Sequence, residues 1–311
     1  MSVDVRTEAG TEVGTTVRTA VRTEDDGAAV TFEAAGVQLL RYVYPGDPEP
    51  AESPKPYIHP LRTLAGDVVT AYRPHDHRWH KGLQLTASYL SGENFWGGGS
   101  YVRELGRYAD VDNHGSIRHD AFEAVGDGRV DERLSWLSRA GEPWLTERRR
   151  ITAAVLGDDV WELVWSTELT ALRGEPLRFG SPTTQGRPLA GYSGLVWRGP
   201  RSFTDGEVIG PDGGGEELMG RPGPWLAFCG VHDEVDRSST VVMESPEAGS
   251  GPRTHWFVRS STYPVLNPSW AFHEEFALAR GEQLTRRYRI TVADGAWDAA
   301  RITDHLERHP F

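Results

Sequence analysis

The chain has 311 residues, of which 38% are hydrophobic, and it contains 11 tryptophans, 10 tyrosines and 10 phenylalanines. Aromatic side chains bury a large apolar area each, so this content can fill the core of one large β-sandwich or barrel. The 45 acidic residues outnumber the 33 basic ones and give a formal net charge of −12, which disfavours nucleic acid and anionic membrane surfaces as partners.

The N-terminal segment does not look like a signal peptide. Residues 1–26 lack the apolar core of a signal peptide, and no run of about 18 apolar residues occurs that could cross a membrane. The single cysteine, Cys229, excludes an intrachain disulfide. We therefore expect a cytoplasmic protein with an N-terminal extension at residues 1–27 and a single β-sandwich domain at residues 28–311.

Segments typical of strands follow one another along almost the whole chain. They are residues 29–32, 37–44, 68–72, 82–88, 117–125, 130–137, 145–156, 160–172, 192–198, 225–231, 240–244, 256–260, 271–278 and 283–293. The turn signal Gly157-Asp158-Asp159 joins the two longest segments. Asp294 can cap a short helix that follows at residues 296–308. The pattern predicts an all-β fold, a large antiparallel two-sheet β-sandwich with one short C-terminal helix.

Histidines cluster in the first third of the chain. Four of the 11 fall between residues 59 and 80: His59, His75, His77 and His80. An extended backbone would put His75 and His77 on one side and Asp76 on the other. His80 joins them only if the chain turns, which Pro74 and Gly82 make plausible. Imidazole titrates near neutrality, transfers protons and binds metals, so the cluster indicates a functional site.

Three explanations of this cluster remain open. The histidines can act as general acid or base, with Asp76 or a distant carboxylate as partner. In the second explanation, His75, His77 and His80 bind a divalent transition metal, although no cofactor is otherwise predicted. In the third, they are ordinary polar residues of a loop.

Two consecutive glutamates, Glu274 and Glu275, supply candidate carboxylates near the C-terminal end. Neighbouring residues of a strand face opposite ways, so one of them can reach a site while the other faces solvent or the rim of the core. A glutamate in an aromatic cleft would have a raised pKa and could serve as a base. The ordinary explanation is that both are solvated strand residues.

Aromatic and planar polar side chains recur in glycine-rich segments. Ring faces stack on the carbons of a sugar, and planar amide and guanidinium groups bind its hydroxyls. The candidate substrate-binding residues are Arg62, Asp76, Lys81, Trp96, Gln185, Tyr192, Trp197, Arg198, Trp256 and Arg259. The ordinary explanation for this set is that the tryptophans lie in the core and the arginines on the surface, without a role in binding.

Several blocks of the sequence resemble a known family. They are residues 55–57, 59–62, 74–82, 94–96, 191–200, 256–259 and 281–295. In this order they resemble the PmoA-like family, a domain of unknown function (DUF6807), from about residue 30 to 295. That name comes from a membrane-embedded copper subunit of methane monooxygenase, and this chain has no segment that could cross a membrane. The family is bacterial, and the resemblance implies a role in carbohydrate catabolism.

The resemblance also leads us to expect a galactose mutarotase-like supersandwich, in which a histidine acid and a glutamate base lie on the concave sheet. The mutarotase motifs do not match this sequence residue by residue, so no catalytic role is carried over from them. Our candidate catalytic residues remain those chosen from the sequence itself: His59, His75, His77, His80, Glu274 and Glu275.

These observations favour a carbohydrate-active enzyme that transfers protons on a sugar or keto-sugar, by mutarotation, epimerisation or glycoside cleavage. One alternative is a metal-dependent lyase or hydrolase with a histidine-bound divalent ion. Another is a non-catalytic carbohydrate-binding protein. The expected partner is a small-molecule sugar, and pairing of sandwich edges into a homodimer is a further expectation.

Overall fold

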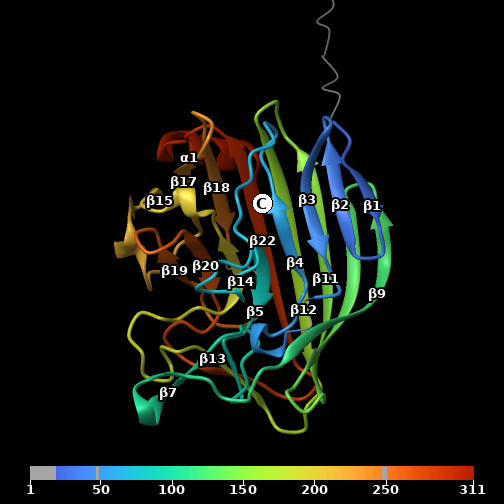
Figure 1. Cartoon of the computed structure of the whole chain (residues 1–311), viewed down its shortest axis with the longest axis vertical. Coiled ribbons are helices and arrows are strands. Elements are labelled where there is room, and N and C mark those ends of the chain that lie inside the picture. Colours follow the sequence, from blue (N-terminus) through green and yellow to red (C-terminus); the bar gives the residue numbers. More distant parts are fainter. Residues whose placement is uncertain (1–18, 47–48, 247–250) are drawn as a thin grey trace, which may run out of the picture.

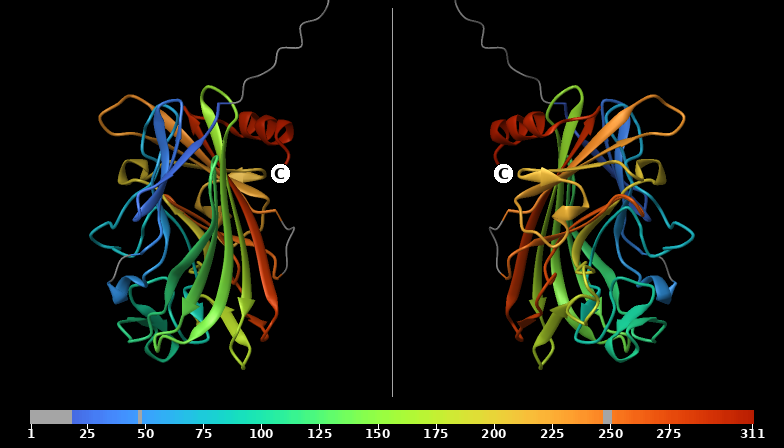
Figure 2. Two further views of the ribbon diagram at one scale, coloured as in Figure 1. Left: turned by 90° about the vertical axis from the view of Figure 1, so that its right-hand side faces the viewer. Right: turned by 90° about the vertical axis from the view of Figure 1, so that its left-hand side faces the viewer.

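Two large antiparallel sheets, packed face to face, make up most of the computed structural model, which describes residues 19–46, 49–246 and 251–311 (Figures 1 and 2). The eight-stranded sheet has the order β1 (Arg22–Asp25), β2 (Ala29–Ala34), β3 (Val37–Val43), β4 (Tyr57–Leu61), β5 (Leu83–Thr86), β14 (Gly194–Arg198), β20 (Val265–Ser269) and β19 (His255–Arg259). The nine-stranded sheet has the order β16 (Gly213–Gly214), β15 (Glu207–Gly210), β17 (Trp225–Val231), β18 (Ser238–Glu244), β22 (Gln283–Asp294), β12 (Val160–Ala171), β11 (Pro143–Val155), β10 (Arg129–Leu137) and β9 (Ser116–Gly126).

Smaller elements gather at the end of the sandwich where the long loops lie (Figure 1). A three-stranded sheet has the order β21 (Phe276–Leu278), β13 (Leu177–Gly180) and β6 (Tyr89–Leu90), and a hairpin pairs β7 (Ser100–Val102) with β8 (Arg107–Ala109). Short 3₁₀ turns occur at Pro50–Glu52, Arg103–Leu105, Arg201–Phe203 and Glu216–Leu218.

The main core lies between the two large sheets. Strand β12 alternates as the sequence indicates, with Trp161, Leu163 and Trp165 fully buried in this core. The Trp161 indole N–H donates to the Arg62 carbonyl across the core at 2.8 Å and so links the two sheets. The structure confirms the predicted all-β fold. It is a large antiparallel two-sheet sandwich, and the described residues include one short helix near the C-terminus.

Two of the predicted strands do not form as expected, and several strands of the structure, β4, β13 and β15 among them, fall outside the predicted segments. Residues 68–72 make only isolated bridges and form no strand. Of the predicted strand 271–278 only Phe276–Leu278 is extended, while Val265–Ser269 before it forms β20. Strand β20 could not be predicted because it contains Pro268, which has no N–H to donate and is unusual inside a sheet. In the structure β20 nevertheless pairs with β14 on one side and β19 on the other.

The one α-helix within residues 19–46, 49–246 and 251–311, α1 (Ala299–Arg308), begins later than predicted. Its N-cap is Asp298, whose carboxylate accepts the Arg301 N–H at 2.8 Å, whereas Asp294 ends strand β22. Ile302 packs against the outer face of the nine-stranded sheet, where it meets Trp297 and Trp225. Strand β1 falls inside the predicted N-terminal extension of residues 1–27, of which residues 1–18 lie outside the described part of the chain.

A charged network is buried between the sheets. The Arg149 guanidinium donates to both carboxylate oxygens of Glu147, at 2.7 and 2.8 Å, and to the Tyr42 hydroxyl at 2.9 Å. The Trp136 indole N–H also binds Glu147, at 2.8 Å, and Tyr42 donates to Glu132. Because these side chains are almost completely buried, each charge depends on its partners to offset the loss of hydration.

Replacing Arg149 by methionine should lower the free energy of unfolding by about 3–5 kcal/mol, because Glu147 would remain buried without its cation. The matched control is Arg148→Met on the same strand, whose exposed side chain should contribute less than about 0.5 kcal/mol. Chemical denaturation of the three proteins measures both changes. Equal losses in the two variants would contradict the role given to the buried network.

Candidate functional site

A cavity of about 590 Å³ opens on the outer face of the eight-stranded sheet. Its floor is formed by Val196 of β14, Phe257 of β19 and Val265 of β20. Successive side chains of a strand face opposite ways, so the neighbours Trp197 and Trp256 point into the main core instead. The volume is within the roughly 300–1,000 Å³ of small-molecule sites.

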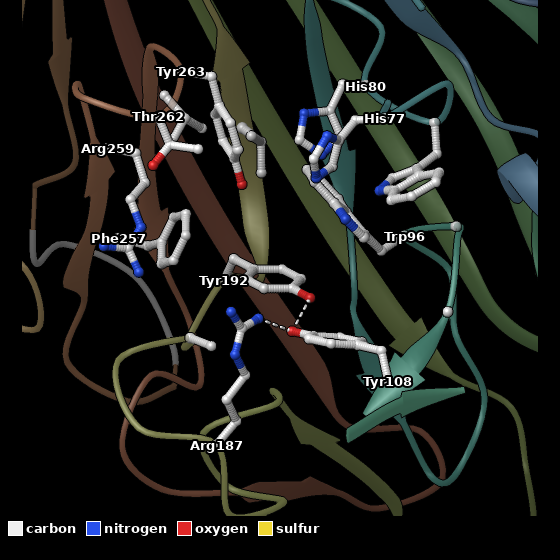
Figure 3. A pocket seen from close by; sticks show the side chains of 16 residues that line it. His77, His80, Trp96, Tyr108, Arg187, Tyr192, Phe257, Arg259, Thr262 and Tyr263 are labelled. Carbon is white, nitrogen blue, oxygen red and sulfur yellow. Dashed lines mark hydrogen bonds between the residues drawn. The ribbon is translucent and has the colours of Figure 1, made fainter. Parts of the chain in front are cut away.

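The walls come from loops that are distant in the sequence. Figure 3 shows His77, His80 and Trp96 along one side and Thr262, Arg259 and Phe257 along the opposite side, and the Tyr263 ring between them contacts both histidines. A third group, Tyr108, Arg187 and Tyr192, closes the end away from the histidines. The cavity is therefore walled by aromatic rings, with imidazole, phenol and guanidinium groups between them.

His77 is oriented by an acid of its own loop. Its Nδ1 lies 3.1 Å from one carboxylate oxygen of Asp76, and Arg201 donates to the other oxygen. Although burial alone would raise the pKa of Asp76, the hydrogen bond to His77 and the charges of His77 and Arg201 lower it. A carboxylate at Nδ1 favours the tautomer with a proton there, which leaves Nε2 able to accept a proton.

His80 is the most deeply buried histidine of the cluster, with 3% of its surface exposed. Its ring centroid lies 4.8 Å from that of His77 and 4.9 Å from that of Trp96. Burial, then the charges of His77, Arg198 and Lys55, lower the pKa of His80 well below 6.5. His80 is therefore neutral at neutral pH, and its Nδ1 has no hydrogen-bond partner among the described residues.

The loop that carries these histidines is clamped at both ends by one buried glutamate. Glu52 is bound by Arg73 at the start of the loop, at 3.1 Å from Nε, and by Lys81 at its end, at 2.8 Å. The backbone also closes there, since the Arg73 N–H donates to the His80 carbonyl at 2.9 Å. Burial alone would raise the pKa of Glu52, but the Arg73 and Lys81 hydrogen bonds and charges hold it below the ordinary value.

Lys55, the other lysine of the chain, supports the wall that carries Trp96. Its buried ammonium group donates to three backbone carbonyls, those of Glu52, Ser53 and Trp96, at 3.0, 2.6 and 3.0 Å. Gly97 follows Trp96 with φ of +107°, and a Cβ there would come within 2.8 Å of the Glu52 carbonyl. The close packing requires glycine at this position and fixes Trp96 relative to the histidine loop.

Tyrosines and arginines form the remaining polar surface. The hydroxyls of Tyr108 and Tyr192 lie 2.9 Å apart, and Arg187 donates to Tyr108 while its guanidinium covers the Tyr108 ring at 4.7 Å. On the opposite wall, Arg259 lies 3.4 Å from Glu216. Burial raises the pKa of Tyr263 and, more strongly, that of Tyr192, so both phenols stay protonated at neutral pH.

The structure brings some of the residues predicted from the sequence together. Five line the cavity: His77, His80, Trp96, Tyr192 and Arg259. Asp76 and Lys81 hold the histidine loop instead, and Arg198 lies behind the wall with its guanidinium 4.3 Å from the centroid of the Tyr263 ring. Sequence reasoning did not select Tyr108, Arg187, Phe257, Thr262 or Tyr263 as site residues. Arg187 and Phe257 stand in segments whose aromatic and arginine content the sequence analysis noted, but no local signal marks the other three.

The other predicted residues lie away from the cavity. Trp197 and Trp256 are core residues, and Arg62 binds the Gly66 carbonyl at 2.9 Å. Glu274 and Glu275 are exposed, because the strand begins only at Phe276. Gln185 donates to Glu275 at 2.6 Å, outside the residues that line the cavity.

His75 and His59 are separated from the histidine pair. His75 is exposed beside Arg201, and His59 stacks on Tyr72 with ring centroids 5.2 Å apart. Within the described parts of the chain, no three His, Cys, Asp or Glu side chains are grouped so that they could hold a metal ion. The ligand set His75, His77 and His80 is therefore not assembled here.

Residues 29–307 match the model of the Family of unknown function (DUF6807), so the chain belongs to this family. No curated protein sequence matches the chain. Among the described residues, no helix is both long and apolar enough to cross a membrane.

Several solved structures of carbohydrate-active enzymes are similar in fold. The GH36 α-galactosidase AgaB from Geobacillus stearothermophilus matches over 89% of this chain and 41% of its own, with 11% identity and a TM-score of 0.43. An α-galactosidase from Lactobacillus brevis matches over 93% and 40%, with 10% identity and a TM-score of 0.39. A heparan sulfate lyase HepC mutant from Pedobacter heparinus matches over 90% and 36%, with 10% identity and a TM-score of 0.38. This chain spans about two fifths of the length of these proteins.

His59 should make the protein less stable in mild acid. Burial, then the charge of Arg62, lower the pKa of His59 from 6.5 to about 4 in the folded chain. The unfolded chain therefore binds this proton more readily, and the stabilisation present above pH 6.5 is lost as the pH falls from 6.5 to 4. We expect His59→Gln to reduce the loss of unfolding free energy between pH 7 and pH 5 by about 1 kcal/mol, since the ring is partly exposed.

Urea titrations at the two pH values measure this difference. His75→Gln is the matched control, because it makes the same chemical change at an exposed histidine. An unchanged pH dependence in His59→Gln would show that His59 titrates normally in the folded state.

Proposed function

We propose that this protein is a carbohydrate-active enzyme that transfers protons on a sugar or keto-sugar, with His77 and His80 as its acid–base groups. The observation that carries the proposal is the pairing of two imidazoles at one aromatic-walled cavity. One imidazole is kept neutral by burial, and the other is oriented by a carboxylate. A neutral imidazole can accept a proton, and a carboxylate at Nδ1 stabilises the charge of an imidazole that has accepted one.

The rest of the cavity suits a polyhydroxylated ligand. The rings of Trp96, Tyr192 and Tyr263 offer faces for the apolar side of a sugar, and Arg187 and Arg259 offer planar groups of N–H donors for hydroxyl oxygens. This combination of flat aromatic faces with a few fixed polar groups is typical of a small-molecule site that binds one orientation of its ligand.

The lining residues favour some reactions over others. Hydrolysis of glycosides usually uses two carboxylates about 5–10 Å apart on either side of the bond. In the described structure neither aspartate nor glutamate lines the cavity. Imidazole and phenol groups instead support mutarotation, epimerisation or cleavage by elimination, each of which begins with transfer of a proton.

A non-catalytic carbohydrate-binding protein is the second candidate. It is favoured by the aromatic rings on several sides of the cavity, which would bind a sugar without any need for chemistry. It does not account for the Asp76–His77 pair or for a buried neutral His80 at the same wall.

Removal of either histidine should abolish turnover. We expect His77→Ala and His80→Ala to lower kcat by at least about 100-fold, the usual contribution of a general acid or base. His75→Ala is the matched control, since His75 belongs to the same loop but faces solvent. Proton NMR in heavy water, with a panel of sugars and keto-sugars, follows anomerisation, epimerisation, exchange and bond cleavage together.

Three results are informative in that experiment. Full activity in both alanine variants would end the acid–base proposal. Sugar binding by the unmodified protein with no turnover of any substrate would favour the binding protein instead. A similar loss of activity in His75→Ala would show that the loop matters for structure rather than through the two imidazoles.

The pH dependence of kcat/KM tests His80 as the base. Because burial and nearby positive charges lower the pKa of His80 well below 6.5, it is deprotonated at all higher pH values. We expect kcat/KM to stay level on the acid side from pH 8 to pH 6.5 and to fall only at lower pH. An acid limb centred above pH 6.5 would show that a group other than His80 is the base that limits kcat/KM in the free enzyme.

A further inference from the structure

The charge of the cavity differs from that of the whole chain. The chain carries a formal charge of −12, yet the lining within the described residues includes two arginines and no carboxylate. Negative charge elsewhere on the chain would repel an anion at long range, so any attraction for one must come from this local positive charge.

Of the two arginines that line the cavity, Arg187 is the one that forms no ion pair with a carboxylate among the described residues. Its guanidinium donates to the Tyr108 hydroxyl and lies over the Tyr108 ring, and no carboxylate pairs with it among the described residues. Arg259 differs, because Glu216 lies 3.4 Å away and offsets its charge. A guanidinium has five N–H donors, so the contact with Tyr108 positions Arg187 and leaves most of its donors for a ligand.

A second positive charge lies behind the aromatic wall. Arg198 is 1% exposed, and its guanidinium sits 4.3 Å from the centroid of the Tyr263 ring. It donates to the Pro264 carbonyl at 3.1 Å, while its Nε and Nη2 have no hydrogen-bond partner in the described part of the chain. Burial lowers the pKa of Arg198 to about 10, so it stays charged at neutral pH. A charge buried in this way is screened less by salt than a surface charge.

We propose that the cavity takes a sugar that carries a carboxylate, a uronic acid or sugar acid unit, with that carboxylate bound by Arg187. This inference rests on the proposed function and names the class of its substrate. Arginine binds carboxylates through two parallel N–H bonds, which gives both orientation and strength. Figure 3 places Arg187 at the end of the cavity away from His77 and His80, so the sugar would lie between the anion-binding end and the acid–base groups.

Neutral sugars would leave the charge of Arg187 without compensation in a partly buried site. A carboxylate would supply that compensation, so a preference for acidic sugars should be visible in binding alone, before any chemistry. The preference should also weaken as salt screens the interaction.

Isothermal titration calorimetry with D-glucuronate and D-galacturonate against D-glucose and D-galactose tests the inference. We expect the unmodified protein to bind at least one uronate about 10-fold more tightly than the matching neutral sugar. Arg187→Met should weaken uronate binding about 10-fold or more while changing neutral-sugar binding less than about 3-fold. Arg178→Met, at an exposed position of β13 outside the cavity, is the matched control and should behave as the unmodified protein.

Equal affinity for acidic and neutral sugars, binding of neither, or an unchanged preference in Arg187→Met would overturn the inference. Thermal melting checks that the variant folds. If it does not, the unmodified protein is titrated at about 50 and about 500 mM salt, where only uronate binding should weaken. A salt dependence common to both classes of sugar would count against Arg187.

Failure of this inference can be told apart from failure of the proposed function. Tight binding of uronates without turnover would end the enzymatic proposal and leave the substrate class intact. Turnover of neutral sugars with no preference for uronates would end the inference about the substrate class and leave the enzymatic proposal intact. A double His77→Ala, His80→Ala variant should lose turnover but keep the preference for the acidic sugar.

Discussion

The candidate site depends on one buried carboxylate, that of Glu52. Arg73 and Lys81 stand at the two ends of the histidine loop, and both pair with this side chain. The loop is thereby closed into a turn that sends His77 and His80 into the cavity. A buried ion pair adds little net stability compared with apolar packing, but loss of one partner is costly, so such a pair serves to specify one conformation. Here that conformation is the one in which two imidazoles share a wall.

Acidic side chains elsewhere in the molecule also have polar or charged partners. Between the sheets, Glu147 pairs with Arg149, while Glu132 is bound by Tyr42 and His119. At the cavity the balance changes: Asp76 and Glu216 lie behind the lining and orient other groups, while Arg187 and Arg259 reach the interior. The cavity is therefore polar without being acidic, and its acid–base capacity comes from imidazole and phenol.

Much of the fold could be predicted from local pattern. The alternation in β12 follows directly from Trp161, Leu163 and Trp165, and the turn of the histidine loop was expected from its flanking residues. Gly82 shows why that expectation held, since its φ is +63° and a Cβ would meet the Ile58 carbonyl at 2.1 Å. The partner of the loop could not be predicted, because Glu52 lies in a Pro-rich segment with no signal for an ion pair.

The positions of Glu274 and Glu275 also differ from the expectation that they lie on a strand, and the reason is physical. A shift of strand β21 to Phe276–Leu278 leaves Glu274 and Glu275 in the preceding loop, where water solvates them. Tyr108 and Tyr263 belong to a short hairpin and a loop whose meeting depends on the closure of the whole sandwich. Sequence periodicity reports the face of an element, but it does not report which loops meet over that face.

The positions of the acid–base groups restrict the chemistry that the cavity can support. His77 and His80 lie on one wall with ring centroids 4.8 Å apart, so together they reach one face of a bound sugar. The Tyr263 ring lies beside both histidines, with its centroid 5.1 Å from that of His77 and 5.7 Å from that of His80, and burial keeps this phenol protonated. A neutral imidazole and a protonated phenol therefore stand next to each other, as a base and an acid, at one end of the cavity. Inversion at a carbon needs one group on each face of the sugar, whereas mutarotation or elimination can use groups gathered on one side, as these are.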